Sequence, residues 1–255
     1  RRGPRTTLAA MVFEDVPATD YDRFMGRFSA PLAEVFADWA GVPPTGRMLD
    51  VGSGPGALST VLAERRGAAA VSALDPAPAF VDALRQRLPG VDARVGSAEH
   101  LPFDDGAFDG VYAELVLHFM ADADAGVREM VRVARPGAVV AACVWDFENA
   151  RAPHSLFLGL ASAESGRTRG AARSGTDQGD ISRRLRAAGC ADVVEVELSA
   201  TATFADVDEW WTMHTLGVGS TAHMLDGLDA AAIARVRAAA DEHFGDGPVT
   251  ITGTA

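Results

Sequence analysis

The 255-residue chain contains no lysine, so all 23 of its basic residues are arginine. It carries a formal net charge of −12, and no stretch gathers the arginines into a basic stripe. Because nucleic-acid phosphates are bound by clusters of Lys and Arg, this composition argues against a nucleic-acid partner. No apolar run approaches the roughly 20 residues that a bilayer-spanning helix needs, so we also predict no membrane partner.

Cysteine is scarce as well. Cys143 and Cys190 lie far apart in the sequence, and Cys143 sits inside an apolar, strand-like run. We predict two reduced thiols and a cytoplasmic location. No two of the six histidines are four residues apart, so the metal-ligand pair of a helical zinc site is missing, and we predict no metal. The Ala- and Gly-rich composition is typical of a high-GC bacterial genome.

Hydrophobic residues make up 48% of the chain, which is enough for the core of one large α/β domain. Apolar runs alternate with helical patterns through its first half. We expect strands at 47–51, 70–75, 91–96, 108–113 and 138–145, with helices at 56–66, 78–88 and 122–134. Such alternation predicts a parallel sheet that is covered by helices on both faces.

The segment ahead of the first strand is expected to be helical over 20–40, because its apolar residues recur every three or four positions. Pro31 is expected to break this helix in two, with Ser29 as the cap of the second piece. Residues 1–19 are expected to form an N-terminal extension without fixed structure or foreign to the natural protein, with Met11 as a candidate natural start.

The second half is less regular. The Gly-rich, polar stretch within 147–180 is interpreted as a mobile lid, followed by a helix at 180–189. Alternating apolar residues predict a long strand over 192–204. Two helices are expected within 205–247, which we interpret as a cap insertion, and a short last strand at 249–255.

The stretch MLDVGSGPG places three glycines directly behind the first strand. Ligands of open parallel sheets bind at the carboxyl ends of the strands, where glycines let a ligand approach the backbone. Gly52, Gly54 and Gly56 are either a tight strand-to-helix turn or such a cradle. Asp75 favours the cradle, because it ends the second strand 19 residues after Gly56, where an acid can accept both hydroxyls of a ribose.

Two classes of ribose ligand remain. A dinucleotide site has the pattern Gly-x-Gly-x-x-Gly, and here the third glycine comes one position early, although Ala57 is also compatible with that pattern. Asp50 argues against a pyrophosphate, because like charges repel, and favours a ligand with an ammonium group. A ribose joined to an amino-acid head describes S-adenosylmethionine.

Four stretches carry a resemblance to a known family: LDVGSGPG, ALDPAPAFVDALRQR, GSAEHLPFDDGAFDGVYAELVLHF and REMVRVARPGAVVAACVWD. Together they resemble the class I S-adenosylmethionine-dependent methyltransferases, especially the small-molecule group that includes ubiquinone- and menaquinone-biosynthesis-type enzymes. The resemblance runs from Tyr21 to Asp146 and resumes at LRAAGCADVVEVEL. It implies one methyltransferase domain over 20–255, with a Rossmann-like, doubly wound sheet of seven strands. Most strands would be parallel, and the last would be antiparallel and paired with the sixth.

The resemblance also implies roles for individual residues. The methionine part of the cofactor would be held by Asp50, Gly52, Ser53, Gly54 and Gly56. Asp75 would hold the ribose, with Pro76 beside the adenine. The adenine would meet Ser97, Ala98 and Glu99, although Ser97 replaces the usual acid. Further contacts would come from Glu114 and Leu115 after the fourth strand, and from Tyr21 and Arg27 in a segment that folds over the site.

Methyl transfer to a small-molecule acceptor, leaving S-adenosylhomocysteine, is therefore the predicted function, with positioning as the main source of catalysis. His118 is the candidate base. An apolar acceptor pocket is predicted from Trp145, Phe147, His154, Trp210, Trp211 and His214. Two alternatives stay open: a protein that binds S-adenosylmethionine without transferring methyl, and an NAD(P)-dependent oxidoreductase. A monomer and a homodimer are both compatible with the sequence.

Overall fold

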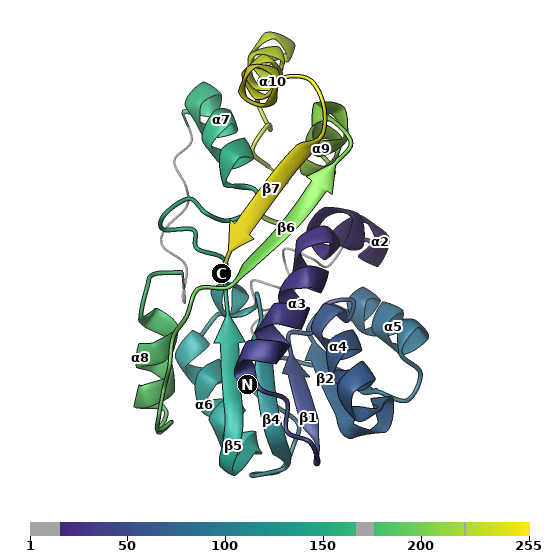
Figure 1. Ribbon diagram of the computed structural model, residues 1–255, viewed down its shortest axis with the longest axis vertical. Coiled ribbons are helices and arrows are strands. Elements are labelled where there is room, and N and C mark those ends of the chain that lie inside the picture. Colours follow the sequence, from purple (N-terminus) through teal and green to yellow (C-terminus); the bar gives the residue numbers. More distant parts are fainter. Residues whose placement is uncertain (1–15, 167–175, 222) are drawn as a thin grey trace, which may run out of the picture.

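The structure of the protein, a computed structural model, describes residues 16–166, 176–221 and 223–255 (Figure 1). Most of the predicted N-terminal extension, including Met11, lies outside the described residues, as does 167–175 of the predicted lid.

Five parallel strands form the main sheet, in the order β3-β2-β1-β4-β5. They are β1 (Met48–Val51), β2 (Val71–Asp75), β3 (Asp92–Val95), β4 (Phe108–Glu114) and β5 (Ala134–Cys143). Every residue of β1, β2 and β4 is buried, as expected for central strands with helices on both faces. The order of connection reverses between β1 and β4, so the carboxyl end of β1 lies at the point where such sheets bind ligands.

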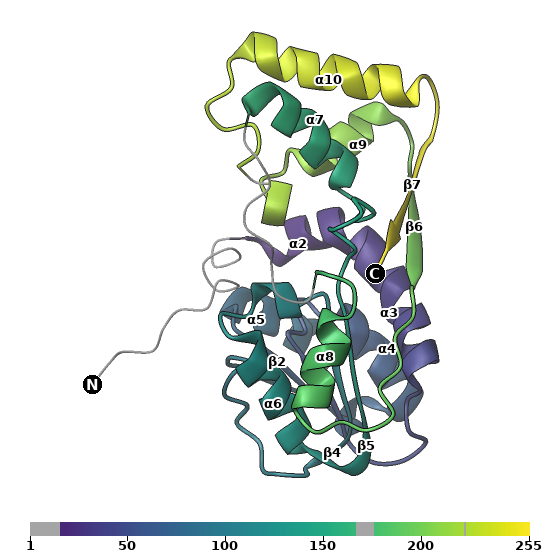
Figure 2. The same ribbon diagram turned by 90° about the vertical axis from the view of Figure 1, so that its left-hand side faces the viewer.

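Helices cover both faces of this sheet (Figure 2). They are α3 (Arg27–Ala40), α4 (Ala57–Arg66) and α5 (Pro78–Arg87) on one face, and α6 (Ala123–Val133) and α8 (Asp180–Ala187) on the other. Side chains alternate between the two faces: Met48 and Ala73 join the core under α3, α4 and α5, whereas Leu49 and Leu74 join the core under α6 and α8.

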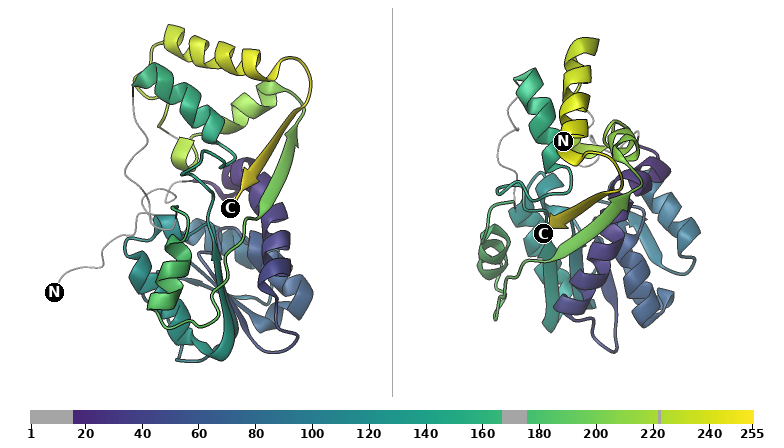
Figure 3. Two further views of the ribbon diagram at one scale, coloured as in Figure 1. Left: turned by 60° about the vertical axis from the view of Figure 1, so that its left-hand side comes forward. Right: turned by 45° about the horizontal axis from the view of Figure 1, so that its top comes forward.

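A helical cap stands beyond the carboxyl ends of the strands (Figures 1 and 3). It contains α7 (Ser155–Ser165), α9 (Val207–His214), the 3-10 turn η4 (Gly219–Thr221) and α10 (Ala230–Phe244). An antiparallel ribbon of β6 (Ser199–Phe204) and β7 (Val249–Thr254) leads to it. Part of the predicted lid is thus α7, which packs on α10. The core under α3 continues into the cap through residues such as Trp145 and Trp210. No helix of the described segments is long and apolar enough to cross a bilayer.

The expectation of one seven-stranded sheet is wrong. Among the described residues, β6 and β7 pair only with each other, and the main sheet ends at β5. Residues 192–198, expected to begin a long strand, pair with no strand in the described part of the chain. The reason is the path of β7, which meets the β5 side only at its tip, where the Asp146 N–H donates to the Thr254 carbonyl at 2.8 Å.

The expected break at Pro31 is also wrong. The chain passes without interruption from α2 (Ala18–Tyr21) through a π-helical turn, η1 (Asp22–Gly26), into α3, and Pro31 lies inside α3. Ser29 is a buried residue of α3 rather than a cap. A proline ring meets the carbonyl four residues earlier, here that of Arg27. The widened π-helical turn ends directly before Arg27, and we attribute the tolerance of Pro31 to it.

Candidate functional site

The glycine turn after β1 has a backbone that requires glycine. Gly52, Gly54 and Gly56 have φ angles of 73°, 53° and 104°, in the left-handed region. The N–H groups of Gly52 and Ser53 both donate to the Leu74 carbonyl, at 2.7 and 3.0 Å, which fastens the turn to β2. Gly56 then caps α4, whose N-terminus points back into the turn.

The three glycines are needed for different reasons. A Cβ on Gly52 would clash with the Val116 side chain, and one on Gly56 would come within 3.2 Å of Leu84. A Cβ on Gly54 would meet only the Tyr21 ring, at 3.9 Å. Gly52 and Gly56 are therefore required by packing, whereas Gly54 faces the space that a ligand would use.

Asp75 closes this turn from the end of β2. Its Oδ2 accepts the Gly54 N–H at 2.8 Å, and its Oδ1 accepts the Ala77 N–H at 2.8 Å. The side chain is buried, and this burial raises the pKa of Asp75 to about 6, although both hydrogen bonds act in the opposite direction.

Two further buried carboxyl groups face the same region. Asp50 accepts the Ser59 hydroxyl at 2.6 Å through Oδ2, while its Oδ1 has no partner among the described residues. Burial raises the pKa of Asp50 to about 7. Glu114, at the end of β4, has an unpartnered Oε1 within the described chain. Burial raises its pKa well above the usual value, and the nearby Asp50 adds to this.

These groups surround a small cavity of about 30 Å³. It is lined by Tyr21, Asp22, Ser29, Asp50, Gly52, Ser53, Gly54, Pro55, Ala57, Leu58, Glu114 and Leu115. None of these described lining residues is basic. Tyr21 roofs the cavity and packs on the Phe80 ring, with 5.0 Å between ring centroids. The space suits water but is far below the roughly 300–1,000 Å³ of a ligand pocket, so a ligand enters only when the segment of Tyr21 moves.

Seven of the predicted residues line this cavity: Tyr21, Asp50, Gly52, Ser53, Gly54, Glu114 and Leu115. Asp75 and Pro76 lie directly behind the turn. The sequence analysis missed Ser29, whose buried hydroxyl has no partner among the described residues, and Ser59, which holds Asp50. Neither serine has a distinctive pattern in the sequence, and only the packing of α3 and α4 beside Asp50 reveals them.

The predicted adenine contacts are tied to the start of α6. Glu99 Oε1 accepts the Ala121 N–H at 2.9 Å, and its other oxygen accepts the Ser97 hydroxyl. Ala98 is buried among the residues under α6. None of the three lines the cavity, so their adenine contacts stay a prediction.

Arg27 points away from the cavity. It forms an ion pair with Glu209 of α9, donates to the Thr203 carbonyl at 3.4 Å, and lies over the Phe204 ring at 5.0 Å. Arg27 thus joins α3 to the cap in this structure through its ion pair with Glu209, and its contact with the cofactor stays a prediction.

Most of the predicted acceptor residues form a row of rings between the sheet and the cap. His118, in the 3-10 turn η3 (Leu117–Phe119), contacts Phe147 with centroids 5.5 Å apart, and Phe147 contacts His154 at 5.3 Å. Phe24 bridges His154 to His214, at 6.1 and 5.5 Å. The sequence analysis did not identify Phe24, which connects the two halves of the row.

The cap end of this row is buried. Trp210 is fully buried and lies 4.4 Å from His214 between ring centroids, and the Trp210 carbonyl is 2.8 Å from His214 Nδ1. Burial lowers the pKa of His214 to about 4, so its ring is neutral at pH 7. Trp145 is buried against Phe28, with 6.5 Å between centroids, and Trp211 lies half-buried beside Arg237. A catalytic role for His118 stays a prediction.

Known proteins match the part of the chain that builds this turn. A family model described as "Methyltransferase domain" matches residues 49–142, from β1 to β5. An uncharacterised methyltransferase of Mycobacterium tuberculosis is 38% identical over 131 residues, 51% of each chain. A malonyl-[acyl-carrier protein] O-methyltransferase of Serratia marcescens is 37% identical over 141 residues, 53% of this chain and 54% of that protein. The chain spans about half the length of these curated relatives.

The solved structure of a putative type II methyltransferase from Anaeromyxobacter dehalogenans superposes with a TM-score of 0.61 at 24% identity, covering 87% of this chain and 92% of that one. At this identity the likeness concerns the fold. The matched sequence, the five-stranded sheet and the acid-flanked glycine turn agree with one another: residues 49–142 match a methyltransferase domain, and the chain has the fold of a methyltransferase.

Proposed function

We propose that the protein transfers a methyl group from S-adenosylmethionine to a small-molecule acceptor. One observation carries the proposal: Asp50, Asp75 and Glu114 are buried at the ends of three neighbouring strands, and none of the described residues that line the cavity beside Asp50 and Glu114 is basic. Buried carboxylates without a counter-ion are costly, and a cationic ligand removes that cost. Bound S-adenosylmethionine brings an ammonium group and a methyl group activated by positive sulfur.

The residues fit such a ligand part by part. The N-terminus of α4, directly after Gly56, suits its carboxylate. Asp50 and Glu114, each with an unpartnered oxygen, suit the ammonium group and the sulfonium. Asp75 suits the ribose hydroxyls, and Tyr21 is placed to close over the bound ligand.

The acceptor is proposed to be small and partly apolar. The row of rings from Phe147 to Trp210 supports this, because aromatic residues provide contact area with little polarity. The neutral His214 adds no charge there. The contribution of the chain is orientation and exclusion of water, and orientation alone is worth about 7–11 kcal/mol in favourable cases.

The two alternatives make different demands on the same residues. An NAD(P)-dependent oxidoreductase would place a pyrophosphate beside Asp50 and Glu114, where like charges repel. A protein that only binds S-adenosylmethionine would use the cavity in the same way but would transfer no methyl group.

Calorimetric titration with S-adenosylmethionine, S-adenosylhomocysteine and NAD distinguishes the proposed function from that of an NAD(P)-dependent oxidoreductase. We expect micromolar binding of the first two ligands and none of NAD; NAD binding without a response to S-adenosylmethionine would overturn the proposal. The second alternative, binding without methyl transfer, is tested by incubation with methyl-labelled S-adenosylmethionine and a panel of phenols, quinols and amines. We expect the label to appear in an acceptor.

A further inference from the structure

Ser29 is a polar residue in the apolar face of α3. This helix is described throughout, and Ser29 is the one polar side chain among its buried residues, which are Phe28, Ser29, Leu32, Ala33, Phe36 and Ala37. The Ser29 side chain is 4% exposed. Alanine has nearly the same size, favours a helix more strongly and brings no polar atom into the core. Packing alone therefore does not account for a serine at this position.

The Ser29 hydroxyl forms no hydrogen bond within the described chain. A serine or threonine in a helix can donate to the carbonyl four residues before it, as Thr60 does to Gly56 at 2.7 Å. Ser29 does not use the Met25 carbonyl in this way. A buried hydroxyl without a partner costs free energy, and a ligand that supplies the partner removes this cost.

Two carboxyl oxygens are in the same state. Asp50 Oδ1 on β1 and Glu114 Oε1 at the end of β4 are buried and have no hydrogen-bond partner among the described residues. β1 and β4 are neighbouring strands, and both carboxyl groups line the small cavity at the glycine turn together with Ser29. The described lining of this cavity therefore contributes three buried oxygens without a partner, two from the sheet and one from α3.

Three such oxygens match a primary ammonium group, which has three N–H donors and no acceptor. Because two of the oxygens belong to carboxyl groups, they favour a cation and repel a carboxylate. The Ser29 hydroxyl can accept a hydrogen bond without placing a third negative charge beside Asp50 and Glu114.

We propose that Ser29 binds the amino group of S-adenosylmethionine as the third acceptor beside Asp50 and Glu114, and that it makes the site specific for an unsubstituted amino group. This inference rests on the proposed function, because it assigns one part of the same ligand. A methyl or acyl substituent on the nitrogen replaces one N–H donor, so that one buried oxygen is again left without a partner.

The test compares S-adenosylhomocysteine with its desamino form, in which a hydrogen replaces the amino group. Both ligands are titrated calorimetrically into the unchanged protein and into Ser29→Ala. We expect Ser29→Ala to bind S-adenosylhomocysteine about ten-fold or more weakly, because it loses a charge-assisted hydrogen bond. The desamino form is expected to bind both proteins equally. The ratio of the two dissociation constants, which measures the preference for the amino group, therefore falls about ten-fold or more in Ser29→Ala.

The titrations also show which proposal fails. Unchanged affinity of Ser29→Ala for S-adenosylhomocysteine, or an equal loss for both ligands, would overturn the inference about Ser29 and leave the proposed function standing. If the unchanged protein binds neither S-adenosylmethionine nor S-adenosylhomocysteine, the proposed function fails and the role of Ser29 fails with it.

Thermal unfolding of the ligand-free protein separates a binding role from a structural one. Ser29→Ala is expected to keep or raise Tm, because the hydroxyl that it removes has no partner in the described chain. Ser59→Ala is expected to lower Tm, because the Ser59 hydroxyl donates to Asp50 at 2.6 Å. The same concentration of S-adenosylhomocysteine should raise Tm less in Ser29→Ala than in the unchanged protein. A fall of Tm in ligand-free Ser29→Ala as large as that in Ser59→Ala would show that the empty fold already uses the hydroxyl, and the inference would be wrong.

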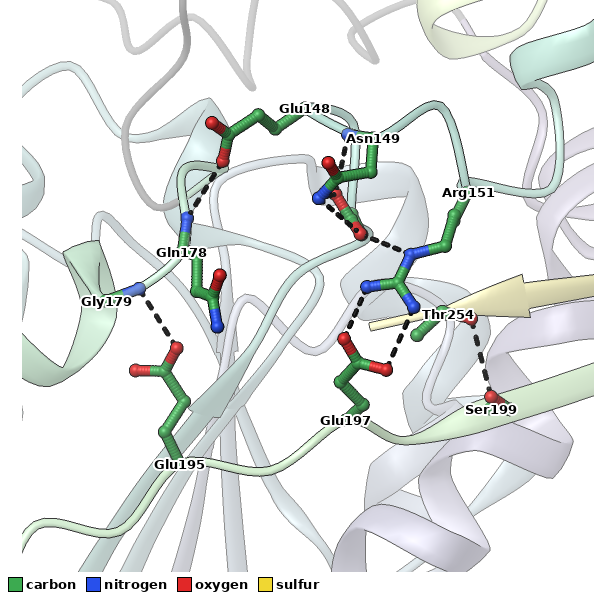
Figure 4. A network of polar contacts seen from close by, with 10 residues as sticks. Glu148, Asn149, Arg151, Gln178, Gly179, Glu195, Glu197, Ser199 and Thr254 are labelled. Atoms are coloured by element: carbon green, nitrogen blue, oxygen red, sulfur yellow. Dashed lines mark hydrogen bonds and ion pairs between the residues drawn. The ribbon is translucent and has the colours of Figure 1, made fainter.

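Ser199→Ala is the matched control. Ser199 begins β6, and its exposed hydroxyl lies 3.4 Å from Thr254 Oγ1 (Figure 4). Ser199 does not line the cavity at the glycine turn. The same loss of a hydroxyl is therefore expected to leave both affinities unchanged. Equal weakening by Ser199→Ala and Ser29→Ala would mean that the effect does not arise at the ammonium group, and the inference would be overturned.

Discussion

Asp75 binds the backbone of the glycine turn with both of its oxygens, taking the Gly54 N–H on one side and the Ala77 N–H on the other, each at 2.8 Å. The residue that is proposed to hold the ribose is therefore also the residue that shapes the turn. Loss of its carboxylate affects the ligand and the fold together.

Asp75→Ala is expected to weaken S-adenosylmethionine binding about 100-fold or more, because charge-assisted hydrogen bonds are worth about 1.5–3 kcal/mol each. It is also expected to lower Tm, since two buried N–H groups lose their acceptor. Calorimetric titration and scanning calorimetry measure the two effects. Asp82→Ala, an exposed aspartate on α5 that pairs with Arg85, is the control. Wild-type affinity in Asp75→Ala would contradict the assignment.

Gly54→Val is expected to abolish S-adenosylmethionine binding and to leave the fold intact. The added side chain projects into the ligand space and meets only the Tyr21 ring. The left-handed backbone makes any such change cost about 1–2 kcal/mol. Gly41→Val is the matched control for that cost, because Gly41 has φ 76° and a Cβ added there would meet no described residue within 4 Å. Circular dichroism and titration compare the pair, and normal binding by Gly54→Val would show that the turn does not cradle the ligand.

Ligand affinity is expected to rise with pH. The pKa values of Asp50 and Asp75 are raised to about 7 and about 6, so the empty site holds protons near pH 6 that a cationic ligand must expel. Titrations between about pH 5.5 and 8 should therefore show tighter binding at the upper end, with protons released to the buffer. S-adenosylhomocysteine, which lacks the sulfonium charge, should respond less, and Asp50→Asn should flatten the profile. Affinity that falls as pH rises would contradict the charge argument.

The raised pKa values of Asp50 and Asp75 also determine how the stability of the ligand-free protein changes with pH. Between about pH 4 and pH 7 the folded protein keeps protons on Asp50 and Asp75 that the unfolded chain has released. These two groups therefore make the free energy of unfolding fall as pH rises through that window. Chemical denaturation of Asp50→Asn and the unchanged protein across the window measures the Asp50 part as a difference in slope.

Tyr21→Ala is expected to speed the association of S-adenosylmethionine. The ring closes the cavity and packs on Phe80, so removing it opens the entry path. Stopped-flow fluorescence measures the association rate. Tyr21→Phe keeps the ring and should behave as the unchanged protein. Identical rates in Tyr21→Ala and the unchanged protein would mean that entry does not depend on the segment of Tyr21.

The first half of the fold was predictable because its signals are local. The strand before Gly52, the acid at Asp75 and the Pro at the start of α5 each depend on neighbours within a few residues. The five expected strands of the main sheet are confirmed, although β5 begins at Ala134 rather than at 138. Strand pairing is not local. Residues 192–198 have the alternation of a strand, but a ladder also needs a partner edge, and β7 turns away to pair with β6.

The site residues could be predicted from the sequence where they are glycines of the turn or acids at the ends of strands. Ser29 and Ser59 escaped because a serine in a helix has no distinctive pattern until the helix is seen to pack beside Asp50. Arg27 is a different case: the resemblance implies a cofactor contact, whereas in this structure its guanidinium pairs with Glu209 of the cap, and the cofactor contact stays a prediction. Contacts between distant segments decide both cases.

The apolar cluster that starts at Met48 in the sheet and passes through Phe28 and Trp145 reaches Trp210 and Ala240 in the cap without a gap. Because these side chains are shared, loss of the cap would open the core under α3, α4 and α5, although the separate core under α6 and α8 lies on the other face of the sheet. We therefore expect heat to melt cap and sheet in a single endotherm whose van't Hoff and calorimetric enthalpies agree. Heat resistance in this protein is then a property of the whole chain, and a destabilising change in α10 lowers the melting temperature of the glycine turn as well.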